Sequence, residues 1–123
     1  GKQQTKTKIK KILIAEDDVH NYLYLEKALK KLELDILHAW NGKEALELFK
    51  ENTDIQLVLM DIKMPVMDGL QAVREIKNIN EAIQVVAITA YVLDEERMKY
   101  KSHGFDGYLT KPVMKETLLE LFM

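Results

Sequence analysis

The sequence predicts an α/β fold, a parallel sheet of five strands with helices on both of its faces. Three continuous apolar runs of four residues, at 12–15, 57–60 and 85–88, are typical of strands that are buried on both faces. Stripes of apolar residues at helical spacing separate these runs, so strand and helix alternate five times along the chain. Alternation of this kind indicates βαβ units with right-handed crossovers and a parallel sheet.

The first half of the chain contains two strand–helix units. After the first strand, Ile12 to Ala15, Asp18 is the expected N-cap of a helix whose apolar residues recur at spacings of three and four, namely Tyr22, Leu25, Leu29 and Leu32. The segment from Leu34 to Ala39 alternates between apolar and polar residues, which indicates a strand that is exposed on one face or lies at a sheet edge. Asn41-Gly42 is typical of a turn, and the helix after it has an inward stripe of Ala45, Leu46 and Phe49.

The second half contains three more units. The strand that begins at Leu57 leads into Asp61, and Asp68-Gly69 opens a helix with an inward stripe of Leu70, Val73 and Ile76. The remaining elements are a buried strand, a highly charged helix closed by Gly104, a brief strand and a last helix, at Val85–Thr89, Asp94–Ser102, Tyr108–Thr110 and Lys115–Met123. The Lys111-Pro112 pair marks the boundary before that last helix.

Composition limits the classes of function. A chain of 123 residues without cysteine has the length of one domain and has no disulfide or thiol chemistry. Its net charge of -2 gives no basic footprint for nucleic acid. The longest nearly apolar run, Val85 to Leu93, is too short to span a bilayer, and no signal peptide is recognisable. The expected location is the cytoplasm.

The N-terminal segment differs from the rest of the chain. Residues 1–11 contain five lysines and a single apolar residue, Ile9, and such a composition cannot bury enough surface to order itself. We therefore expect residues 1–11 to be a linker or a leader left by cloning, and residues 12–123 to form the domain. Gly1 in the place of Met indicates a segment taken from a longer chain.

Polar side chains stand where four of the strands end. The first strand is followed by Glu16 and Asp17, and the third by Asp61. The fourth strand ends in Thr89, and the fifth is followed by Lys111. The carboxyl ends of parallel strands share one edge of the sheet, and with strand order 2-1-3-4-5 the crevice falls between strands 1 and 3. The acidic pair and Asp61 would then converge.

Three converging carboxylates favour a divalent cation. Two unit charges about 4 Å apart cost on the order of 4 kcal/mol at an effective dielectric near 20. Oxygen ligands of this kind suit Mg²⁺, which also takes phosphate oxygens. In such a site Asp61 could attack a phosphorus atom while Lys111 holds the equatorial oxygens and Thr89 donates to one of them. Each feature alone has a structural alternative, namely a solvated acidic surface, a strand-end threonine or a Lys-Pro helix boundary.

Four segments carry a family resemblance, namely Ile12–Asp18, Leu57–Gly69, Ala87–Ala90 and Tyr108–Pro112. Together they resemble the receiver domains of two-component response regulators over 11–123, which implies a flavodoxin-like (βα)5 three-layer sandwich. The resemblance implies that Asp61 accepts a phosphoryl group from a phosphohistidine on a kinase. The implied Mg²⁺ ligands are Glu16, Asp17, Asp61 and the backbone carbonyl of Lys63. The implied switch consists of Thr89 and Tyr108, and a cis bond is expected between Lys111 and Pro112.

The acidic motif departs from the commonest family pattern. Glu16 stands where aspartate is more frequent, so its metal contact is expected to run through water, and Val19 stands where proline is often found. The acidic pair could also be Asp17-Asp18. We favour Glu16-Asp17 because it directly follows the apolar run and leaves Asp18 to cap the helix.

Phosphorylation would add roughly -1.5 to -2 charge at Asp61. We expect Thr89 to move toward the phosphoryl group and the Tyr108 ring to turn into the space that opens, although Tyr108 could instead be an edge-strand aromatic packed on the last helix. Lys63 and Tyr91 lie two residues beyond Asp61 and Thr89, at the mouth of the expected site. Tyr91 either hinders the hydrolytic water or is a surface side chain without kinetic effect.

The expected role is that of a phosphoacceptor in a two-component phosphorelay. Self-phosphotransfer and autodephosphorylation would be the only chemistry of the domain itself. The lysine-rich leader and the missing effector favour the receiver of a hybrid sensor histidine kinase, membrane-anchored or not, over the N-terminal receiver of a DNA-binding response regulator. The expected partners are a histidine kinase, a histidine phosphotransfer domain, and a second copy that pairs through the last two strand–helix units. No direct contact with nucleic acid or membrane is expected.

Three other interpretations stay open. A haloacid-dehalogenase-like phosphatase would need Asp-x-Asp after the first strand, whereas Asp61 follows the third strand with Lys63 two places on. A flavodoxin-like carrier would need a phosphate loop rich in Ser, Thr and Gly at the position of 16–18, where the carboxylates would repel a phosphate. A receiver-like interaction module that is never phosphorylated would have no need of the intact site.

Overall fold

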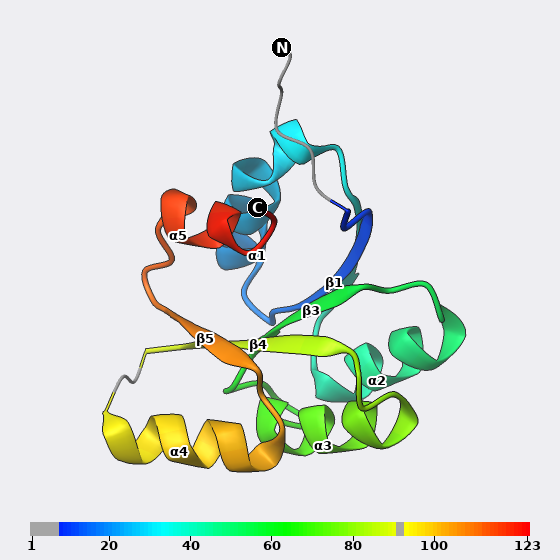
Figure 1. Cartoon of the computed structure of the whole chain (residues 1–123), viewed down its shortest axis with the longest axis vertical. Coiled ribbons are helices and arrows are strands. Elements are labelled where there is room, and N and C mark those ends of the chain that lie inside the picture. The colour runs from blue at the N-terminus through cyan, green and yellow to red at the C-terminus, as the bar shows by residue number, and fades with distance from the viewer. Residues whose placement is uncertain (1–7, 91–92) are drawn as a thin grey trace.

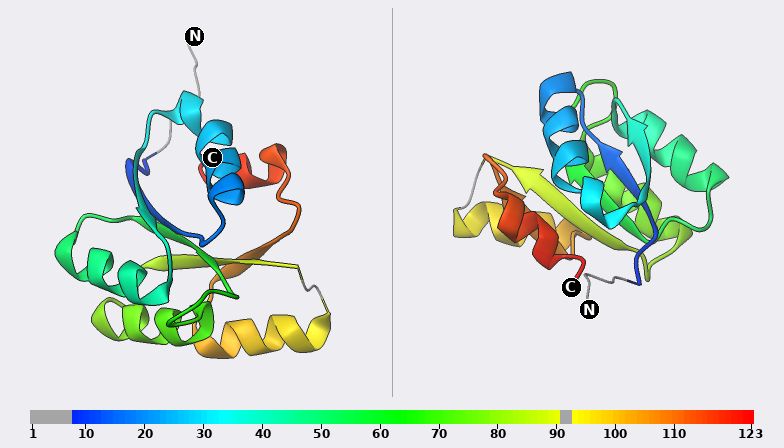
Figure 2. Two further views of the ribbon diagram at one scale, coloured as in Figure 1. Left: turned by 180° about the vertical axis from the view of Figure 1, so that it is seen from behind. Right: turned by 90° about the horizontal axis from the view of Figure 1, so that it is seen from above.

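The computed structural model describes residues 8–90 and 93–123. Its five strands form one parallel sheet in the order β2-β1-β3-β4-β5, which confirms the predicted fold. Figures 1 and 2 show three layers, with α1 and α5 on one face of the sheet and α2, α3 and α4 on the other. The strands are β1 (Lys11–Ala15), β2 (Asp35–Ala39), β3 (Leu57–Asp61), β4 (Gln84–Thr89) and β5 (Gly107–Thr110).

The helices are α1 (Val19–Ala28), α2 (Gly42–Glu51), α3 (Gly69–Ile79), α4 (Asp94–His103) and α5 (Lys115–Glu120), with a 3-10 turn η1 at Lys30–Leu32. Short side chains cap three of them, because Asp18, Asn41 and Asp68 each accept hydrogen bonds from N–H groups of the first turn. Asn41-Gly42 is therefore the start of α2 and not a separate turn. In the described part of the chain no helix has the length and apolar character needed to cross a membrane.

Two predicted helices are shorter than the apolar pattern indicated. The first ends at Ala28, and η1 carries the chain to Glu33, whose φ of 54° is left-handed. The apolar stripe continued to Leu32 because a 3-10 turn also repeats about every three residues. The last helix ends at Glu120, after which three N–H groups bond to the carbonyls three residues earlier, which buries Phe122.

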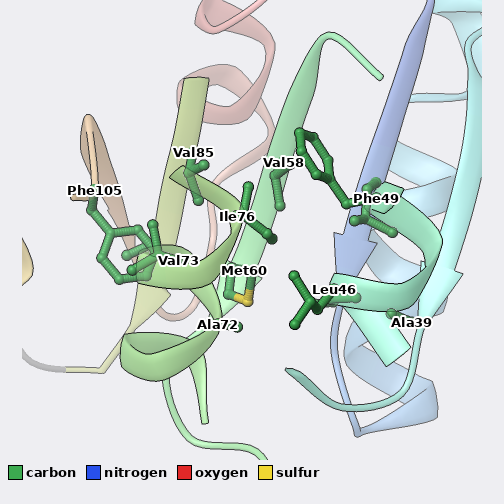
Figure 3. Packing of buried hydrophobic residues seen from close by; sticks show 14 of the residues in the cluster. Ala39, Leu46, Phe49, Val58, Met60, Ala72, Val73, Ile76, Val85 and Phe105 are labelled. Atoms are coloured by element: carbon green, nitrogen blue, oxygen red, sulfur yellow. The ribbon is translucent and has the colours of Figure 1, made fainter. Parts of the chain in front are cut away.

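The sheet has a separate apolar core on each face. Alternate residues of one strand point to opposite faces, so Val58 and Met60 belong to one core while Leu57 and Leu59 belong to the other. The core under α2 and α3 is shown in Figure 3, where Ile76 packs between the strands and the helices. Full burial of one such side chain contributes about 1.5–3 kcal/mol. Helices cover both faces, which is why the strands are continuously apolar.

The described part of the N-terminal segment is hydrogen-bonded to the domain. The amide oxygen of Gln56 accepts from the N–H groups of Lys10 and Lys11 at 2.6 and 3.2 Å, and its NH2 group donates to the carbonyl of Lys8 at 3.0 Å. Strand β1 accordingly begins at Lys11, one residue before the predicted start. The division into residues 1–11 and 12–123 stays a prediction.

Candidate functional site

Three carboxylates meet at the carboxyl edge of the sheet. Asp61 is the last residue of β3, and Glu16 directly follows the neighbouring strand β1. Glu16, Asp17 and Asp61 each offer an oxygen, and these oxygens lie within 4.8 Å of one another. Asp18 points elsewhere, because its side chain accepts from the N–H groups of His20 and Asn21 at the start of α1. The acidic pair of this cluster is therefore Glu16-Asp17.

Asp61 is 4 % exposed and has a donor on each oxygen. Its Oδ2 accepts from Nζ of Lys111 at 2.9 Å, and its Oδ1 accepts from the backbone N–H of Lys63 at 3.2 Å. These two donors fix the plane of the carboxylate, and the ammonium group partly compensates its charge. The side chain of Lys63 is exposed and lies at the rim of the site.

Glu16 is almost fully buried and holds one oxygen without a donor. Its Oε2 accepts from the N–H of Asp18 at 3.1 Å, whereas Oε1 accepts no hydrogen bond from the described residues, and Nζ of Lys111 lies 4.0 Å away. Burial and the charge of Asp61 raise the pKa of Glu16 from 4.5 to about 7. A buried acceptor without a donor is costly. The site thus has the unsatisfied oxygen and the excess negative charge that a cation would relieve.

The backbone of Glu16 is held from the sheet edge. Its N–H donates to the carbonyl of Ala39 at 3.0 Å, and its carbonyl is bonded to Nε2 of His38 at 2.9 Å. The His38 ring stacks on Tyr22 of α1 with 3.6 Å between ring centroids and an angle of 3°. His38 was not recognised from the sequence, where it is only one polar residue in an alternating edge strand.

Lys111 is positioned by the end of β5. Its N–H donates to the carbonyl of Thr89 at 2.8 Å, and its bond to Pro112 is cis, as expected. Burial lowers the pKa of Lys111, but the hydrogen bond to Asp61 and the nearby negative charges outweigh it, so the net pKa is raised. Lys111 therefore stays a cation over the physiological range and balances one of the three carboxylates.

The loop after β3 brings α3 against the main chain of Asp61. The N–H of Gly69 donates to the carbonyl of Ile62 at 2.9 Å, and a Cβ at position 69 would lie 2.4 Å from the carbonyl oxygen of Asp61. A tight turn precedes it, closed by a 2.7 Å hydrogen bond from the N–H of Met67 to the carbonyl of Pro65, with Val66 at a φ of 67°. Only glycine allows this approach of the helix to the strand end.

Thr89 lies at the end of β4 and contacts α4. Its Oγ1 is 2.8 Å from the hydroxyl of Tyr100, and both residues are 3 % exposed. The sequence placed Thr89 at the correct strand end but gave no role to Tyr100. The available signal was that Tyr100 is the only tyrosine, phenylalanine or tryptophan in helix α4, which is rich in charged residues.

Tyr108 on β5 is half-buried and contacts α4. The guanidinium carbon of Arg97 lies 5.0 Å from the centroid of its ring, a cation–π contact, and the ring packs against the core that contains Tyr100 and Phe105. The alternative in which Tyr108 packs on the last helix is therefore wrong, because β5 turns this side chain toward the α4 face. Tyr91 lies outside the described residues.

Two clefts border the carboxylates. One, of about 780 Å³, is lined by Asp17, Lys63 and Asp68 on one side and by Glu96, Lys99 and Tyr100 of α4 on the other. The second, of about 600 Å³, runs between α1 and the segment after β5, where it is lined by Glu16, Tyr24, Leu25, Lys111, Pro112 and Met114. A reacting group could reach the cluster from either side.

Comparisons with known proteins identify the family of the chain. The family model described as "Response regulator receiver domain" matches residues 12–122. The chain is 35 % identical over 119 residues to "Hybrid signal transduction histidine kinase I" of Dictyostelium discoideum, covering 90 % of this chain and 7 % of that protein. It is 36 % identical to "Chemotaxis protein CheY" of Halobacterium salinarum, covering 90 % of this chain and 92 % of that protein. The chain thus spans a small part of the first relative and nearly all of the second.

Solved structures give the same result. The receiver domain of the Saccharomyces cerevisiae response regulator Ssk1, in a co-crystal with the histidine phosphotransfer signalling protein Ypd1, superimposes with a TM-score of 0.90 and 30 % identity. The match covers 97 % of this chain and 89 % of that one. The five-stranded topology, the family model and these relatives together show that the chain belongs to the response regulator receiver domain family, whose members act in two-component phosphorelay signalling.

Proposed function

We propose that Asp61 is the phosphoacceptor of this receiver domain. A carboxylate oxygen of Asp61 would attack the phosphorus of a phosphohistidine, so that a P–O bond forms while the P–N bond breaks and the imidazole nitrogen keeps the electron pair. The observation that carries the proposal is the pair of donors on Asp61, Nζ of Lys111 at 2.9 Å and the N–H of Lys63 at 3.2 Å. They orient the carboxylate. After the transfer, the ammonium group of Lys111 can donate a hydrogen bond to an oxygen of the phosphoryl group.

The acidic cluster supports a magnesium site. Glu16, Asp17 and Asp61, together with the backbone carbonyl of Lys63, would hold Mg²⁺, which when bound supplies positive charge beside the phosphoryl oxygens. The fit rests on the three converging carboxylate oxygens and on the buried, donor-free Oε1 of Glu16. Asp17 is exposed, so its carboxylate can reach the ion from the open side of the site.

We further propose that Thr89 and Tyr108 form the switch. Thr89 would turn its hydroxyl toward the phosphoryl group, and the Tyr108 ring would leave its contact with Arg97 as the surface of α4 and β5 changes. Their positions support this, because Thr89 ends β4 and Tyr108 lies on the adjacent strand β5, where Ala87 is its register partner. The altered surface could also serve a second copy, paired through β4-α4 and β5-α5.

The partner that fits best is a histidine phosphotransfer domain. The 600 Å³ cleft leads to Glu16 and Lys111, and two of the side chains that line it, Tyr24 and Met114, are exposed and largely apolar. An apolar helix face could dock there and bring its histidine to Asp61. The Ssk1 receiver, similar over 97 % of this chain, was crystallised with such a protein. We place the chain in a hybrid histidine kinase, with a DNA-binding response regulator as the alternative; its cytoplasmic location also stays a prediction.

Acetyl phosphate with Mg²⁺ tests the acceptor. The intact mass should rise by one phosphoryl group in wild type and not in Asp61→Asn, and a chelator should abolish the labelling. Asp18→Asn is the matched control, because asparagine is an equally good N-cap for α1 and position 18 is outside the cluster. Equal labelling of Asp61→Asn would refute the proposal. Continuous turnover of a small phosphate ester would instead favour the phosphatase interpretation.

A further inference from the structure

The hydroxyl of Tyr100 connects Thr89 directly to helix α4. Its oxygen lies 2.8 Å from Oγ1 of Thr89, and both side chains are shielded from water. The Tyr100 ring is held on the other side by an edge-on contact with Phe105, with 6.2 Å between the centroids. The phenol is therefore a buried group that connects the end of β4 to α4.

Tyr100 also lies between the two hollows on this side of the molecule. The first is the 780 Å³ cleft beside Asp17 and Lys63. The second is a groove of about 530 Å³ that is lined by Arg97 and Tyr108. Within 8–90 and 93–123, Tyr100 is the single residue that lines both. A displacement of its ring would change the entrance to the carboxylates and the surface around Tyr108 together.

We propose that Tyr100 is the positioning residue that couples Thr89 to α4. Its hydroxyl holds Thr89 in the unphosphorylated state, and the bond is given up when Thr89 turns toward the phosphoryl group, which releases α4. The proposal rests on the proposed function, because it needs Asp61 as acceptor and Thr89 as its hydrogen-bond donor. Tyr100 lies on α4, a different element from Thr89 on β4 and Tyr108 on β5. Its proposed role is to pass the movement of Thr89 on to α4.

Hydrogen-bond capacity explains the direction of the effect. A threonine hydroxyl has one proton, so Thr89 must orient that proton toward the phosphoryl oxygen in order to donate to it. When Oγ1 moves away from α4, the phenol of Tyr100 is left buried without this partner, which disfavours the phosphorylated form. Removal of the phenol oxygen takes away that penalty and also weakens the unphosphorylated arrangement. Both effects shift the equilibrium toward the phosphorylated arrangement.

The test uses Tyr100→Phe and beryllofluoride with Mg²⁺ as the phosphoryl mimic. The loss of one buried hydrogen bond that exists only in the free state predicts binding that is about 3- to 10-fold tighter than in wild type. Tyr22→Phe is the matched control, because Tyr22 is also a buried tyrosine and donates to Glu26 at 3.1 Å, but on the opposite face of the sheet. Its affinity for the mimic should equal that of wild type.

A second measurement follows NMR signals in wild type and in Tyr100→Phe. When the mimic is added to wild type with ring-labelled tyrosine, the NMR signals of the Tyr100 ring should change. The amide signals of α4 should change at the same mimic concentration as the ring signals. In Tyr100→Phe without mimic, the α4 amides should already lie part of the way toward the bound positions. Unchanged affinity in Tyr100→Phe together with an unchanged Tyr100 ring signal would overturn the coupling. No binding of the mimic by wild type would instead contradict the proposed function.

Discussion

Glu16→Gln should stabilise the metal-free protein at neutral and alkaline pH. In the free domain the charged Glu16 is buried beside Asp61, and its pKa is raised from 4.5 to about 7. Because the folded state holds this proton more tightly than the unfolded chain, wild-type stability should fall as the pH rises from about 4.5 to about 7. Gln is nearly isosteric with Glu and keeps an oxygen for the N–H of Asp18, but it has no charge to bury.

The size of the effect follows from the two pKa values. The gap between 4.5 and about 7 corresponds to about 3 kcal/mol of folding free energy as an upper bound. Gln would also lose the ion pair with Lys111, which at 4.0 Å is weak. We therefore expect Glu16→Gln to be about 1–3 kcal/mol more stable than wild type at pH 8, and equal to it near pH 4.5.

Urea unfolding in the presence of a chelator measures this difference at pH 4.5, 6 and 8. Glu47→Gln on the exposed side of α2 is the control and should leave the pH dependence unchanged. Addition of Mg²⁺ should make wild type more stable than Glu16→Gln. Wild type gains stability by RT ln(1 + [Mg²⁺]/Kd), and the variant binds the ion less well. Mg²⁺ affinity of wild type should rise with pH up to about 7. A Glu16→Gln variant with the same pH profile as wild type would refute the reasoning.

Three other substitutions probe the site and its support. Lys111→Met removes the cation that pairs with Asp61, and should lower metal-free stability at pH 8 by about 1–2 kcal/mol in urea unfolding; a variant as stable as wild type would contradict the ion-pair geometry. Gly69→Ala should cost about 1–3 kcal/mol and reduce labelling by acetyl phosphate, whereas Gly107→Ala, whose Cβ would meet nothing within 4 Å, should do neither. Ile76→Ala should cost about 2–5 kcal/mol in thermal unfolding, and a smaller loss would show that the α3 core relaxes.

The parallel sheet and the convergence of the cluster could be predicted because they depend on patterns within single segments, whereas the strand order 2-1-3-4-5 came with the family resemblance. The apolar run before Asp61 identifies a buried strand, and the alternation of strand and helix indicates that the strands are parallel. Glu16 and Lys111 then reach Asp61 because parallel strands end at one edge. Helix ends were less predictable, because the turn after Ala28 keeps the apolar residues of a helix while its hydrogen bonds change.

The contacts of Tyr100 and His38 could not be predicted from the sequence. Tyr100 reaches Thr89 only because α4 docks on the sheet at a particular rotation, and a charged helix with a weak apolar face does not determine that rotation. His38 bonds to the carbonyl of Glu16 because β2 pairs with β1 in register, which places it beside the acidic motif. In both cases the chemistry depends on packing between distant segments, which no local pattern records.

Transfer from a phosphorylated histidine phosphotransfer protein tests the central claim most directly. When the phosphotransfer protein, radiolabelled in its phosphoryl group, is mixed with this chain and Mg²⁺, the label should pass to the chain. Peptide mapping should then locate the label at Asp61. The label should stay on the donor when Asp61→Asn replaces wild type. Label found on another residue, or taken up equally by Asp61→Asn, would contradict the account.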